Sequence, residues 1–258
     1  MTRVYAVSDV HGYRDVLVRA LAEEGLTDAD GRWAGLDARL WFLGDYLDRG
    51  PDGVGVIDLV RGLVDESEGA VGALLGNHEV LALGMRQFGA TTIQPPGEAE
   101  RSFARSWGRN GGLAGDQARL TDEHVEWLRA LPMAARDAGA LLVHSDTLAY
   151  LEWGRTLEDL NAAGRDLLQS DDLAVWWETW RRLTSRAAFR GEGGPQAARE
   201  LLDHLGGDRV VHGHSIVAEM LGRDYTDVAE PLSYADGRAL AIDGGIYEGG
   251  PCLVARLA

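Results

Sequence analysis

The sequence predicts an α/β fold built on parallel strands, and three observations carry this prediction. Short apolar segments with β-branched residues alternate with segments whose apolar residues recur at helical spacing. Polar side chains that can bind metals follow directly after these expected strands. The 258 residues, 45% of them hydrophobic, are enough for one large domain with a substantial core. Successive strand, loop and helix units imply parallel strands joined by right-handed crossovers.

Three such units open the chain. The expected strands are residues 3–7, 39–43 and 70–75, and the expected helices are residues 13–24, 54–64 and 79–88. In the second helix, Val56, Leu59, Val60 and Leu63 fall on one face. In sheets of this type a ligand site forms beyond the carboxyl ends of the strands. We therefore expect the polar groups that follow the three strands to converge in space.

The rest of the chain adds an insertion, further helices and a β region. Residues 91–135 contain polar loops such as TIQPPGEAE and short helices, one with Thr121 as its N-cap. We expect them to form a cap beside the site, within a single domain of residues 1–258. The remaining expected helices are residues 154–186 and 201–205, and the remaining strands are residues 140–143, 209–211, 239–242 and 253–257, the last two in one antiparallel region. The tryptophans at 176, 177 and 180 have a spacing typical of a packing surface, with a substrate platform as the alternative.

Composition excludes several classes of partner. The formal net charge is −16 and all 25 basic residues are Arg, so the chain lacks the cationic surface that nucleic-acid polymers and anionic membranes require. No apolar run approaches the roughly 20 residues that span a bilayer, and no signal segment precedes the first strand. The single cysteine, Cys252, excludes an internal disulfide and fits a reducing compartment. We therefore expect a cytoplasmic protein, and nothing in the sequence indicates its oligomeric state.

Oxygen and nitrogen donors are concentrated in four motifs: SDVHG (8–12), GDYLDRG (44–50), GNHE (76–79) and VHGHS (211–215). In a strand, residues i and i+2 project to the same side, so Asp9 and His11 can bind one cation together. Asp45 has two oxygens and can bridge two cations, and the further donors are Asn77, His144 and His214. Two cations about 3.5–4 Å apart could share Asp45 and a water, lowering the pKa of that water. The absence of sulfur donors favours manganese, with iron or zinc as alternatives.

A second group of residues can supply acid catalysis and phosphate binding. Arg49 offers a planar guanidinium fork to phosphate oxygens. His78 can donate a proton to the departing oxygen, while Asp48 holds the imidazole in the right tautomer and stabilises its charge. Taken singly, GDYLDRG could be a surface turn with an ion pair, and GNHE could be a helix N-cap. The occurrence of all the motifs in order at strand ends favours the catalytic interpretation.

With these motifs, the chain resembles the metallophosphoesterases of the phosphoprotein phosphatase (PPP) family, in particular the compact bacterial calcineurin-like serine/threonine phosphatases, over residues 4–254. The resemblance implies the calcineurin-like metallophosphoesterase fold: a central mixed β-sandwich flanked by helices, with a dimetal site at the C-terminal ends of strands. It implies two ligand sets, Asp9, His11 and Asp45 for the first metal and Asp45, Asn77, His144 and His214 for the second. It also implies Asp48 with His78 as the proton-donating pair and Arg49 as a phosphate clamp.

Two of these assignments have alternatives. His214 is preferred over His212 because the family places this ligand directly after Gly in a strand-ending GH pair, which matches Gly213 and His214. The family also has a second phosphate-binding arginine before that histidine. Arg190 in FRGEGG is the candidate and Arg186 is its competitor.

The chain also departs from the family pattern. After His144 it reads HSDT, where related enzymes usually have a small residue and Gly. Asp146 could support His144 from outside the metal's ligand shell, or it could be a turn residue. The closing turn IDGGIYEGG contains Asp243, for which we expect a structural role.

The leading functional hypothesis is a dimetal-dependent protein serine/threonine phosphatase. In it, a hydroxide bridging the metals attacks phosphorus in line, His78 and Asp48 protonate the leaving group, and Arg49 and Arg190 clamp the phosphate. The alternative is a dinucleoside polyphosphate or other nucleotide hydrolase, similar to the symmetrical diadenosine tetraphosphate hydrolases, and a catalytically silent phosphate-binding module is less favoured. A nuclease is disfavoured by the net charge of −16 and by Ile216 in place of a further His. The expected partner is a phosphorylated protein or a small phosphoester.

Overall fold

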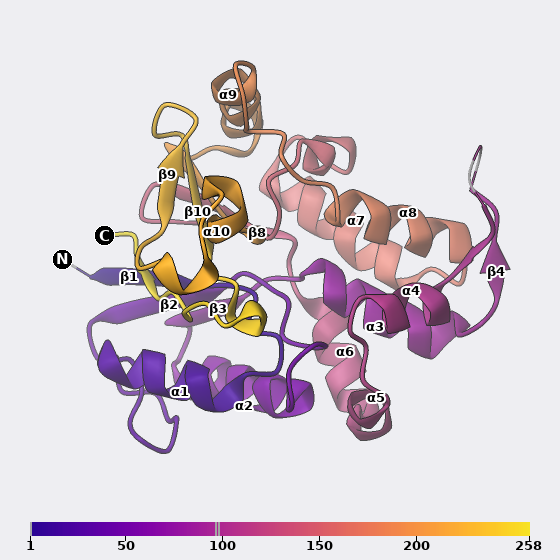
Figure 1. Cartoon of the computed structure of the whole chain (residues 1–258), viewed down its shortest axis with the longest axis horizontal. Helices are drawn as coiled ribbons and strands as arrows, with labels where there is room; N and C mark the ends of the chain where they lie inside the picture. Colours follow the sequence, from indigo (N-terminus) through magenta and orange to yellow (C-terminus); the bar gives the residue numbers. More distant parts are fainter. Residues whose placement is uncertain (1, 96, 98) are drawn as a thin grey trace.

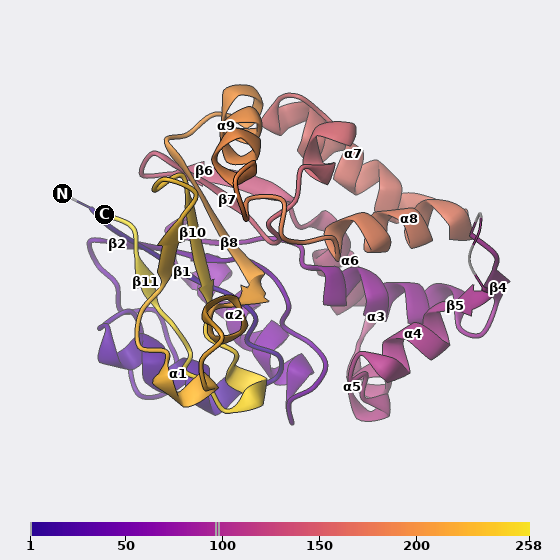
Figure 2. The same cartoon turned by 45° about the horizontal axis from the view of Figure 1, so that its top comes forward.

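The computed structural model describes residues 2–95, 97 and 99–258, which form two main β-sheets with helices outside them (Figures 1 and 2). The first sheet has the order β11-β1-β2-β3 and contains β1 (Arg3–Val7), β2 (Ala38–Phe42), β3 (Val71–Ala73) and β11 (Ala255–Arg256). The second has the order β6-β7-β8-β10-β9 and contains β6 (Ala134–Asp137), β7 (Ala140–Val143), β8 (Arg209–Ile216), β9 (Leu232–Tyr234) and β10 (Ala239–Asp243). A separate antiparallel pair joins β4 (Thr92–Ile93) and β5 (Arg101–Ser102). Positions 96 and 98 of the expected loop TIQPPGEAE lie outside the described residues.

The three predicted strand, loop and helix units build the first sheet. β1 is parallel to β2, and β2 is parallel to β3. The helices that follow the strands are α1 (Arg14–Glu23), α2 (Gly53–Glu66) and α3 (Asn77–Phe88). α3 begins at Asn77 rather than at Glu79, because the Glu79 carboxylate accepts a hydrogen bond from the Gly76 N–H (2.9 Å) and completes the first turn. Asn77 and His78 therefore lie in the first turn of a helix.

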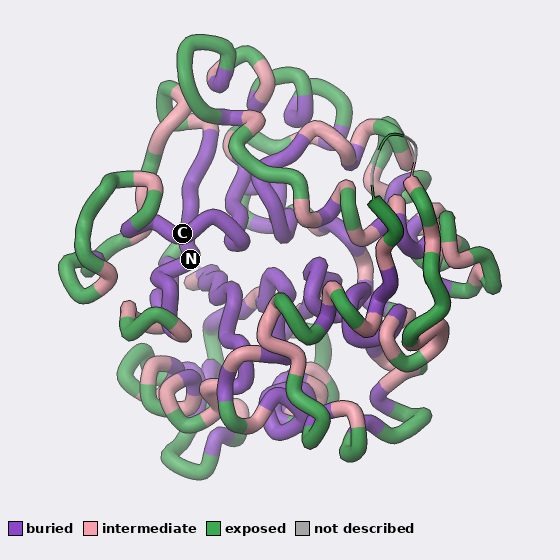
Figure 3. Tube along the Cα trace, turned by 45° about the vertical axis from the view of Figure 1, so that its right-hand side comes forward, coloured by how far each residue is buried: buried purple, intermediate pink, exposed green. Residues whose placement is uncertain are grey.

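The two sheets pack against each other through an apolar layer of small and medium-sized side chains. Its members come from strands of both sheets and from the residues just after β2 and β3: Ala6, Leu43, Leu74, Ala140, Leu142, Val211, Leu240, Ile242 and Ala255. Buried segments run through the centre of the molecule and exposed loops lie at its periphery (Figure 3). This arrangement confirms the predicted mixed β-sandwich flanked by helices.

The C-terminal strands do not form the single antiparallel region expected for residues 239–242 and 253–257. β10 runs parallel to β8 and antiparallel to β9 in the second sheet, whereas β11 runs antiparallel to β1 in the first. Between them the chain turns through the 3₁₀ helix η3 (Ile246–Glu248), which is flanked by Gly245 (φ 75°) and Gly249 (φ 90°). Glycine tolerates this left-handed backbone, and the turn carries the chain from one sheet to the other.

The remaining helices gather mainly on the side of the sandwich where α3 lies (Figure 1). They are α4 (Phe103–Arg109), α5 (Ala114–Arg119), α6 (Asp122–Ala130), α7 (Leu157–Gln169), α8 (Leu173–Leu183), α9 (Gly194–Leu205) and α10 (Val217–Leu221), with the 3₁₀ helices η1 (Ala149–Glu152) and η2 (Tyr225–Asp227). The expected cap, residues 91–135, supplies β4, β5 and α4 to α6 and ends inside β6. Among the described residues, no helix is both long enough and apolar enough to cross a bilayer.

The helix expected over residues 154–186 is two helices, α7 and α8. The chain breaks at Asp172, whose side chain accepts a hydrogen bond from the Ala174 N–H (2.8 Å) and starts α8. Trp176 and Trp177 are 0% and 5% exposed. They pack edge-on against Phe88 and Phe103, so these indole rings belong to the core and not to a substrate platform.

Candidate dimetal site

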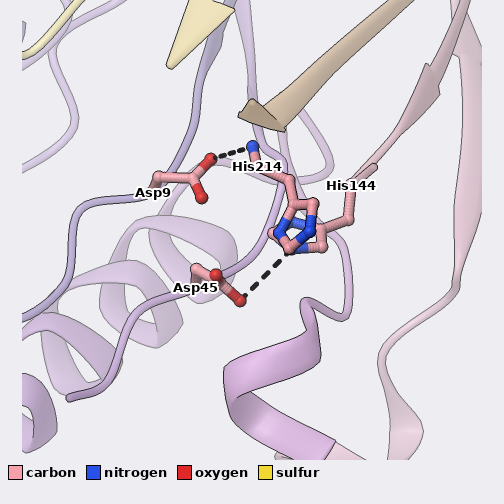
Figure 4. A group of neighbouring side chains, drawn as sticks. All are labelled: Asp9, Asp45, His144 and His214. Carbon is pink, nitrogen blue, oxygen red and sulfur yellow. Dashed lines mark hydrogen bonds and ion pairs between the residues drawn. The ribbon is translucent and has the colours of Figure 1, made fainter. Parts of the chain in front are cut away.

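The polar motifs meet where strands of both sheets end. Asp9 and Asp45 follow β1 and β2, His144 follows β7, and His214 lies near the end of β8. One ligating atom from each of these four residues lies within 4.8 Å of the others, and Figure 4 shows the four side chains gathered around one point. A second group, His11, Asp45 and His78, satisfies the same distance. All the members are buried, and Asp45 is common to both groups.

The backbone at these positions is left-handed. The angle φ is 52° at Asp9, 46° at His11, 61° at Asp45 and 62° at His214, values that residues other than Gly rarely adopt. β1 ends before Asp9, so the strand alternation used to pair Asp9 with His11 does not apply. The loop is held instead by hydrogen bonds from Asp9 N to Gly44 O (3.2 Å) and from His11 N to Asp45 O (2.9 Å). Strain of this kind persists where the surrounding structure fixes it, often at functional sites.

Each predicted histidine ligand donates one ring N–H to a main-chain carbonyl. The donor and acceptor pairs are His11 Nδ1 with Leu47 O (2.8 Å), His144 Nδ1 with Leu43 O (2.8 Å) and His214 Nε2 with Thr184 O (2.9 Å). Because a carbonyl can only accept, the other ring nitrogen of each is left with a free lone pair. The Nε2 atom of His144 lies 3.4 Å from Asp45 Oδ1 and 2.8 Å from Asn77 Oδ1. On the other side of the same carboxylate, His11 Nε2 lies 3.7 Å from Asp45 Oδ2.

The electrostatics of the site suit divalent cations. Burial lowers the pKa of His11 and of His214 well below the ordinary value, and neighbouring histidines lower both further. Burial also raises the pKa of Asp45, and the charge of Asp9 raises it again. Two buried carboxylates this close are costly without a cation between them, and neutral imidazoles are the form that binds metals. This set of oxygen and nitrogen donors therefore fits two divalent cations.

The predicted proton-donating pair lies beside the predicted ligands. His78 Nδ1 is 2.7 Å from Asp48 Oδ2, and the other carboxylate oxygen, Oδ1, accepts a hydrogen bond from the Trp107 indole N–H (2.8 Å). Burial raises the pKa of Asp48 to about 7, while the bond from Trp107 and the charge of Arg49 lower it. Burial lowers the pKa of His78, and Arg49 lowers it further. The Arg49 Nη2 atom lies 3.2 Å from His78 Nε2, so the guanidinium and the acid share one face of the site.

The sequence model of the calcineurin-like phosphoesterase family matches residues 2–218 of this chain. These residues include every predicted metal ligand and the predicted proton-donating pair. The chain belongs to the calcineurin-like phosphoesterases. The curated bis(5'-nucleosyl)-tetraphosphatase (symmetrical) of Burkholderia pseudomallei strain K96243 is 30% identical over 193 residues, covering 63% of this chain and 61% of that protein. The protein of the same name from Bordetella pertussis strain Tohama I is 25% identical over 207 residues, covering 80% of this chain and 61% of that protein. The matched region thus spans 61% of the length of these relatives.

Two solved structures show the same fold. The cold-active protein-tyrosine phosphatase of a psychrophilic Shewanella species superposes with a TM-score of 0.72 and 21% identity, covering 97% of this phosphoesterase and 73% of that chain. A protein serine/threonine phosphatase from Saccharomyces cerevisiae gives a TM-score of 0.59 and 14% identity, covering 94% of this chain and 67% of that one. At these identities the likeness establishes shared architecture alone.

The two candidate phosphate-binding arginines of this phosphoesterase lie in different surroundings. The charge of Arg186 lowers the pKa of His78 and of His214. Arg190, expected from the sequence to clamp phosphate, has its Nε 3.5 Å from the buried Asp146 carboxylate instead. Asp146 also accepts the Ala187 N–H (2.9 Å) in the turn between the two arginines. Arg190 therefore stays a prediction as the second phosphate contact, with Arg186 as its competitor.

Three further residues of the sequence analysis have defined contacts. His212 Nε2 bonds to the Tyr234 hydroxyl (2.7 Å) and its Nδ1 bonds to Gly213 O (2.8 Å), so both ring nitrogens have partners outside the ligand group that contains His214. Asp146 accepts hydrogen bonds from Ser215 Oγ (2.6 Å) and Ala187 N (2.9 Å), and so supports the turn before Arg190 rather than His144. Asp243 Oδ1 accepts the Gly245 N–H (2.9 Å), and burial followed by the charge of Asp9 raises its pKa.

Two aromatic residues at the site are absent from the sequence prediction. Trp107 lies in α4, within the expected cap of residues 91–135, and bonds to Asp48. The Tyr247 ring lies 3.9 Å below the guanidinium carbon of Arg49 and packs edge-on against the His11 ring (5.1 Å between centroids). The only signal for Tyr247 is an aromatic residue inside the glycine-rich turn IDGGIYEGG, and Trp107 has none beyond its place before RNGG.

Proposed function

We propose that this calcineurin-like phosphoesterase hydrolyses phosphoester or phosphoanhydride bonds with two bound divalent cations, manganese first and iron or zinc as alternatives. The observation that carries the proposal is that Asp45 belongs to both ligand groups while the His78 and Asp48 pair lies beside it. The family pattern would give Asp9, His11 and Asp45 to one cation and Asp45, Asn77, His144 and His214 to the other, whereas the structure groups Asp9 with Asp45, His144 and His214, and His11 with Asp45 and His78. When bound, the cations would supply Lewis acidity, which lowers the pKa of water and offsets phosphate charge.

The protein's own groups would then bind the phosphate and deliver a proton. Arg49 and a second arginine, Arg190 or its competitor Arg186, bind phosphate oxygens as cationic donors. His78 Nε2 gives its proton to the leaving oxygen, and Asp48 holds the Nδ1–H and stabilises the imidazolium. Before substrate binds, the Arg49 charge beside Nε2 lowers the pKa of His78. A phosphate that engages Arg49 offsets this charge, so substrate binding favours the protonated acid.

For the substrate we place a dinucleoside polyphosphate first and a phosphorylated serine or threonine second. Relatives named as symmetrical bis(5'-nucleosyl)-tetraphosphatases match this chain at 25% and 30% identity, which supports the nucleotide. The motifs that support a protein phosphatase are shared by both groups of enzymes. The net charge of −16 is compatible with a nucleotide, because a small anion needs cations only at the site itself.

A metal-resolved activity screen tests the proposal. The protein is stripped with a chelator, reloaded separately with Mn²⁺, Zn²⁺ or Fe²⁺, and assayed on diadenosine tetraphosphate, a phosphoserine peptide and p-nitrophenyl phosphate. Addition of one water across the central anhydride of diadenosine tetraphosphate gives two molecules of ADP, which chromatography resolves from ATP and AMP. Faster turnover of the nucleotide supports the first substrate, and faster turnover of the peptide supports the second.

Two variants connect turnover to the proposed residues. Asp45→Asn should lower the bound metal below two ions per chain and abolish hydrolysis. His78→Asn should retain the metal but lose roughly 10²- to 10⁴-fold in kcat, the usual contribution of a positioned general acid. Stoichiometric metal with no turnover of any phosphoester by the wild type would reject the enzyme and leave a phosphate-binding module.

A further inference from the structure

The cap reaches into the site at the loop that carries the acid pair. Besides the bond from Trp107 to Asp48 Oδ1 (2.8 Å), the carbonyl of Gly111 accepts the Arg49 main-chain N–H (2.8 Å). Trp107 lies in the last turn of α4, and the Gly112 N–H bonds back to its carbonyl (2.9 Å). The segment 107–112 therefore contacts two consecutive residues of the GDYLDRG motif.

Those two residues have a backbone conformation that needs support. Asp48 and Arg49 are both left-handed, with φ of 67° and 66°. Two consecutive residues other than Gly in this region are strained, and such strain persists only where neighbouring groups fix it. The bond to Gly111 O fixes the main chain at Arg49, and the bond from Trp107 fixes the side chain of Asp48.

The indole bond also determines how Asp48 meets His78. A carboxylate held through one oxygen can rotate about its own axis, but Asp48 is held through both, by His78 Nδ1 on Oδ2 and by Trp107 Nε1 on Oδ1. Resting on the function proposed above, we propose that Trp107 is a positioning residue of the general acid. It orients Asp48 so that His78 presents its Nε2 proton to the leaving oxygen.

Packing alone does not account for a hydrogen-bonded indole at position 107. Trp177 is just as deeply buried, with 5% exposure against 7% for Trp107, and it packs on Phe103 at the start of the same helix α4. Its indole N–H has no hydrogen-bond partner among the described residues. The aromatic core around Phe103 therefore tolerates an unpaired indole N–H. The pairing of Trp107 with Asp48 is a property of that position, and Trp177 is the matched control.

The test compares Trp107→Phe with Trp177→Phe in the metal-loaded enzyme. Both variants keep an aromatic ring and remove one indole N–H. The substrates are p-nitrophenyl phosphate, whose leaving oxygen needs little protonation, and phenyl phosphate, whose leaving oxygen needs more. In Trp107→Phe, kcat should fall about tenfold more for phenyl phosphate than for p-nitrophenyl phosphate. This factor is smaller than the roughly 10²- to 10⁴-fold that a positioned general acid contributes, because the acid itself is still present. In Trp177→Phe the ratio of the two rates should equal that of the wild type.

A second readout does not require turnover. The proton between His78 Nδ1 and Asp48 should give a downfield ¹H NMR resonance in the zinc-loaded protein, assigned by its loss in His78→Asn. This resonance should shift or broaden in Trp107→Phe and stay in place in Trp177→Phe. If Trp107→Phe folds poorly, Trp107→His keeps a ring N–H donor and should restore the wild-type rate ratio and the resonance.

The outcomes separate the two proposals. A Trp107→Phe enzyme that slows equally on both substrates, or that matches Trp177→Phe in rate ratio and resonance, overturns the positioning role while the proposed function stands. A Trp107→His enzyme that folds but keeps a perturbed ratio overturns it as well. Wild-type protein that hydrolyses neither these aryl phosphates, nor diadenosine tetraphosphate, nor the phosphoserine peptide with any metal overturns the proposed function itself.

Discussion

Replacing Glu79 with Gln tests whether one buried carboxylate holds the backbone of the site. Glu79 is 0% exposed and accepts three main-chain N–H groups. Its Oε2 accepts from Asp45 (2.8 Å) and Gly76 (2.9 Å), and its Oε1 accepts from Tyr46 (2.8 Å). A Gln side chain has the same shape but a single oxygen. Its best orientation keeps the first two bonds and turns the NH₂ group against the Tyr46 N–H, so one buried donor loses its acceptor.

The expected cost follows from that single lost bond. Burial raises the pKa of Glu79 to about 8, so near neutral pH the side chain is mostly uncharged and the lost bond is one to an uncharged acceptor. A buried donor left unsatisfied costs about 1–3 kcal/mol, so we expect the free energy of unfolding to fall by about 2 kcal/mol. For a chain of this size, each kcal/mol lowers Tm by roughly 2–4 °C, which predicts a decrease of roughly 4–8 °C. Calorimetry in the presence of a chelator measures it, because bound cations would stabilise the folded state and mask the loss.

The control for this change is Glu123→Gln, an exposed carboxylate in the first turn of α6. Its cost should stay within about 0.5 kcal/mol, as is usual for surface substitutions. Because Glu79 holds the main chain of Asp45, the Gln variant should also bind Mn²⁺ more weakly, which isothermal titration measures. A Glu79→Gln protein with the Tm and the Mn²⁺ affinity of the control would refute the argument that this carboxylate supports the site.

Three other predictions follow from the electrostatics and burial. Replacing the second phosphate-binding arginine with Ala should raise the inhibition constant of inorganic phosphate about tenfold or more, so a larger effect of Arg190→Ala would support Arg190 and a larger effect of Arg186→Ala would support its competitor. Burial raises the pKa of the Cys252 thiol to about 12, so the folded state disfavours the thiolate, and stability should decline as the pH rises from the ordinary thiol pKa toward 12. At pH 8, iodoacetamide should therefore alkylate Cys252 much more slowly in the folded protein than in urea, and equal rates would contradict this burial. Removal of the bound cations with a chelator should lower Tm, and reloading the cations should restore it. An unchanged Tm would argue against cation binding at Asp45.

The sequence predicts the convergence of the ligands well because that convergence follows from parallel topology. Once three strands are parallel, the residues after them lie at one edge of the sheet, whatever the details of each loop. The strand pairing of residues 239–257 is harder to predict, because pairing between distant segments leaves no local signal in the sequence. The turn flanked by Gly245 and Gly249 carries the chain to the first sheet, where β11 pairs with β1. Local sequence also cannot decide whether Arg186 or Arg190 binds phosphate. Their positions depend on Asp146, which bonds both to Ala187 in the intervening turn and to Ser215 in β8.

The predicted pairing of Asp9 with His11 rests on a geometry that the structure does not have, and the structure groups Asp9 with His144 and His214 instead. Strand alternation predicts that both side chains share a face, but both residues lie beyond β1 in left-handed conformations. Their side chains approach Asp45 because main-chain bonds to Gly44 and Asp45 hold the loop in that strained form. A sequence pattern records which residues are present but not the hydrogen bonds that hold them in an unfavourable backbone. For the same reason the sequence points to the contacting residues Asp48 and His78 but not to Trp107, which bonds to Asp48 from α4.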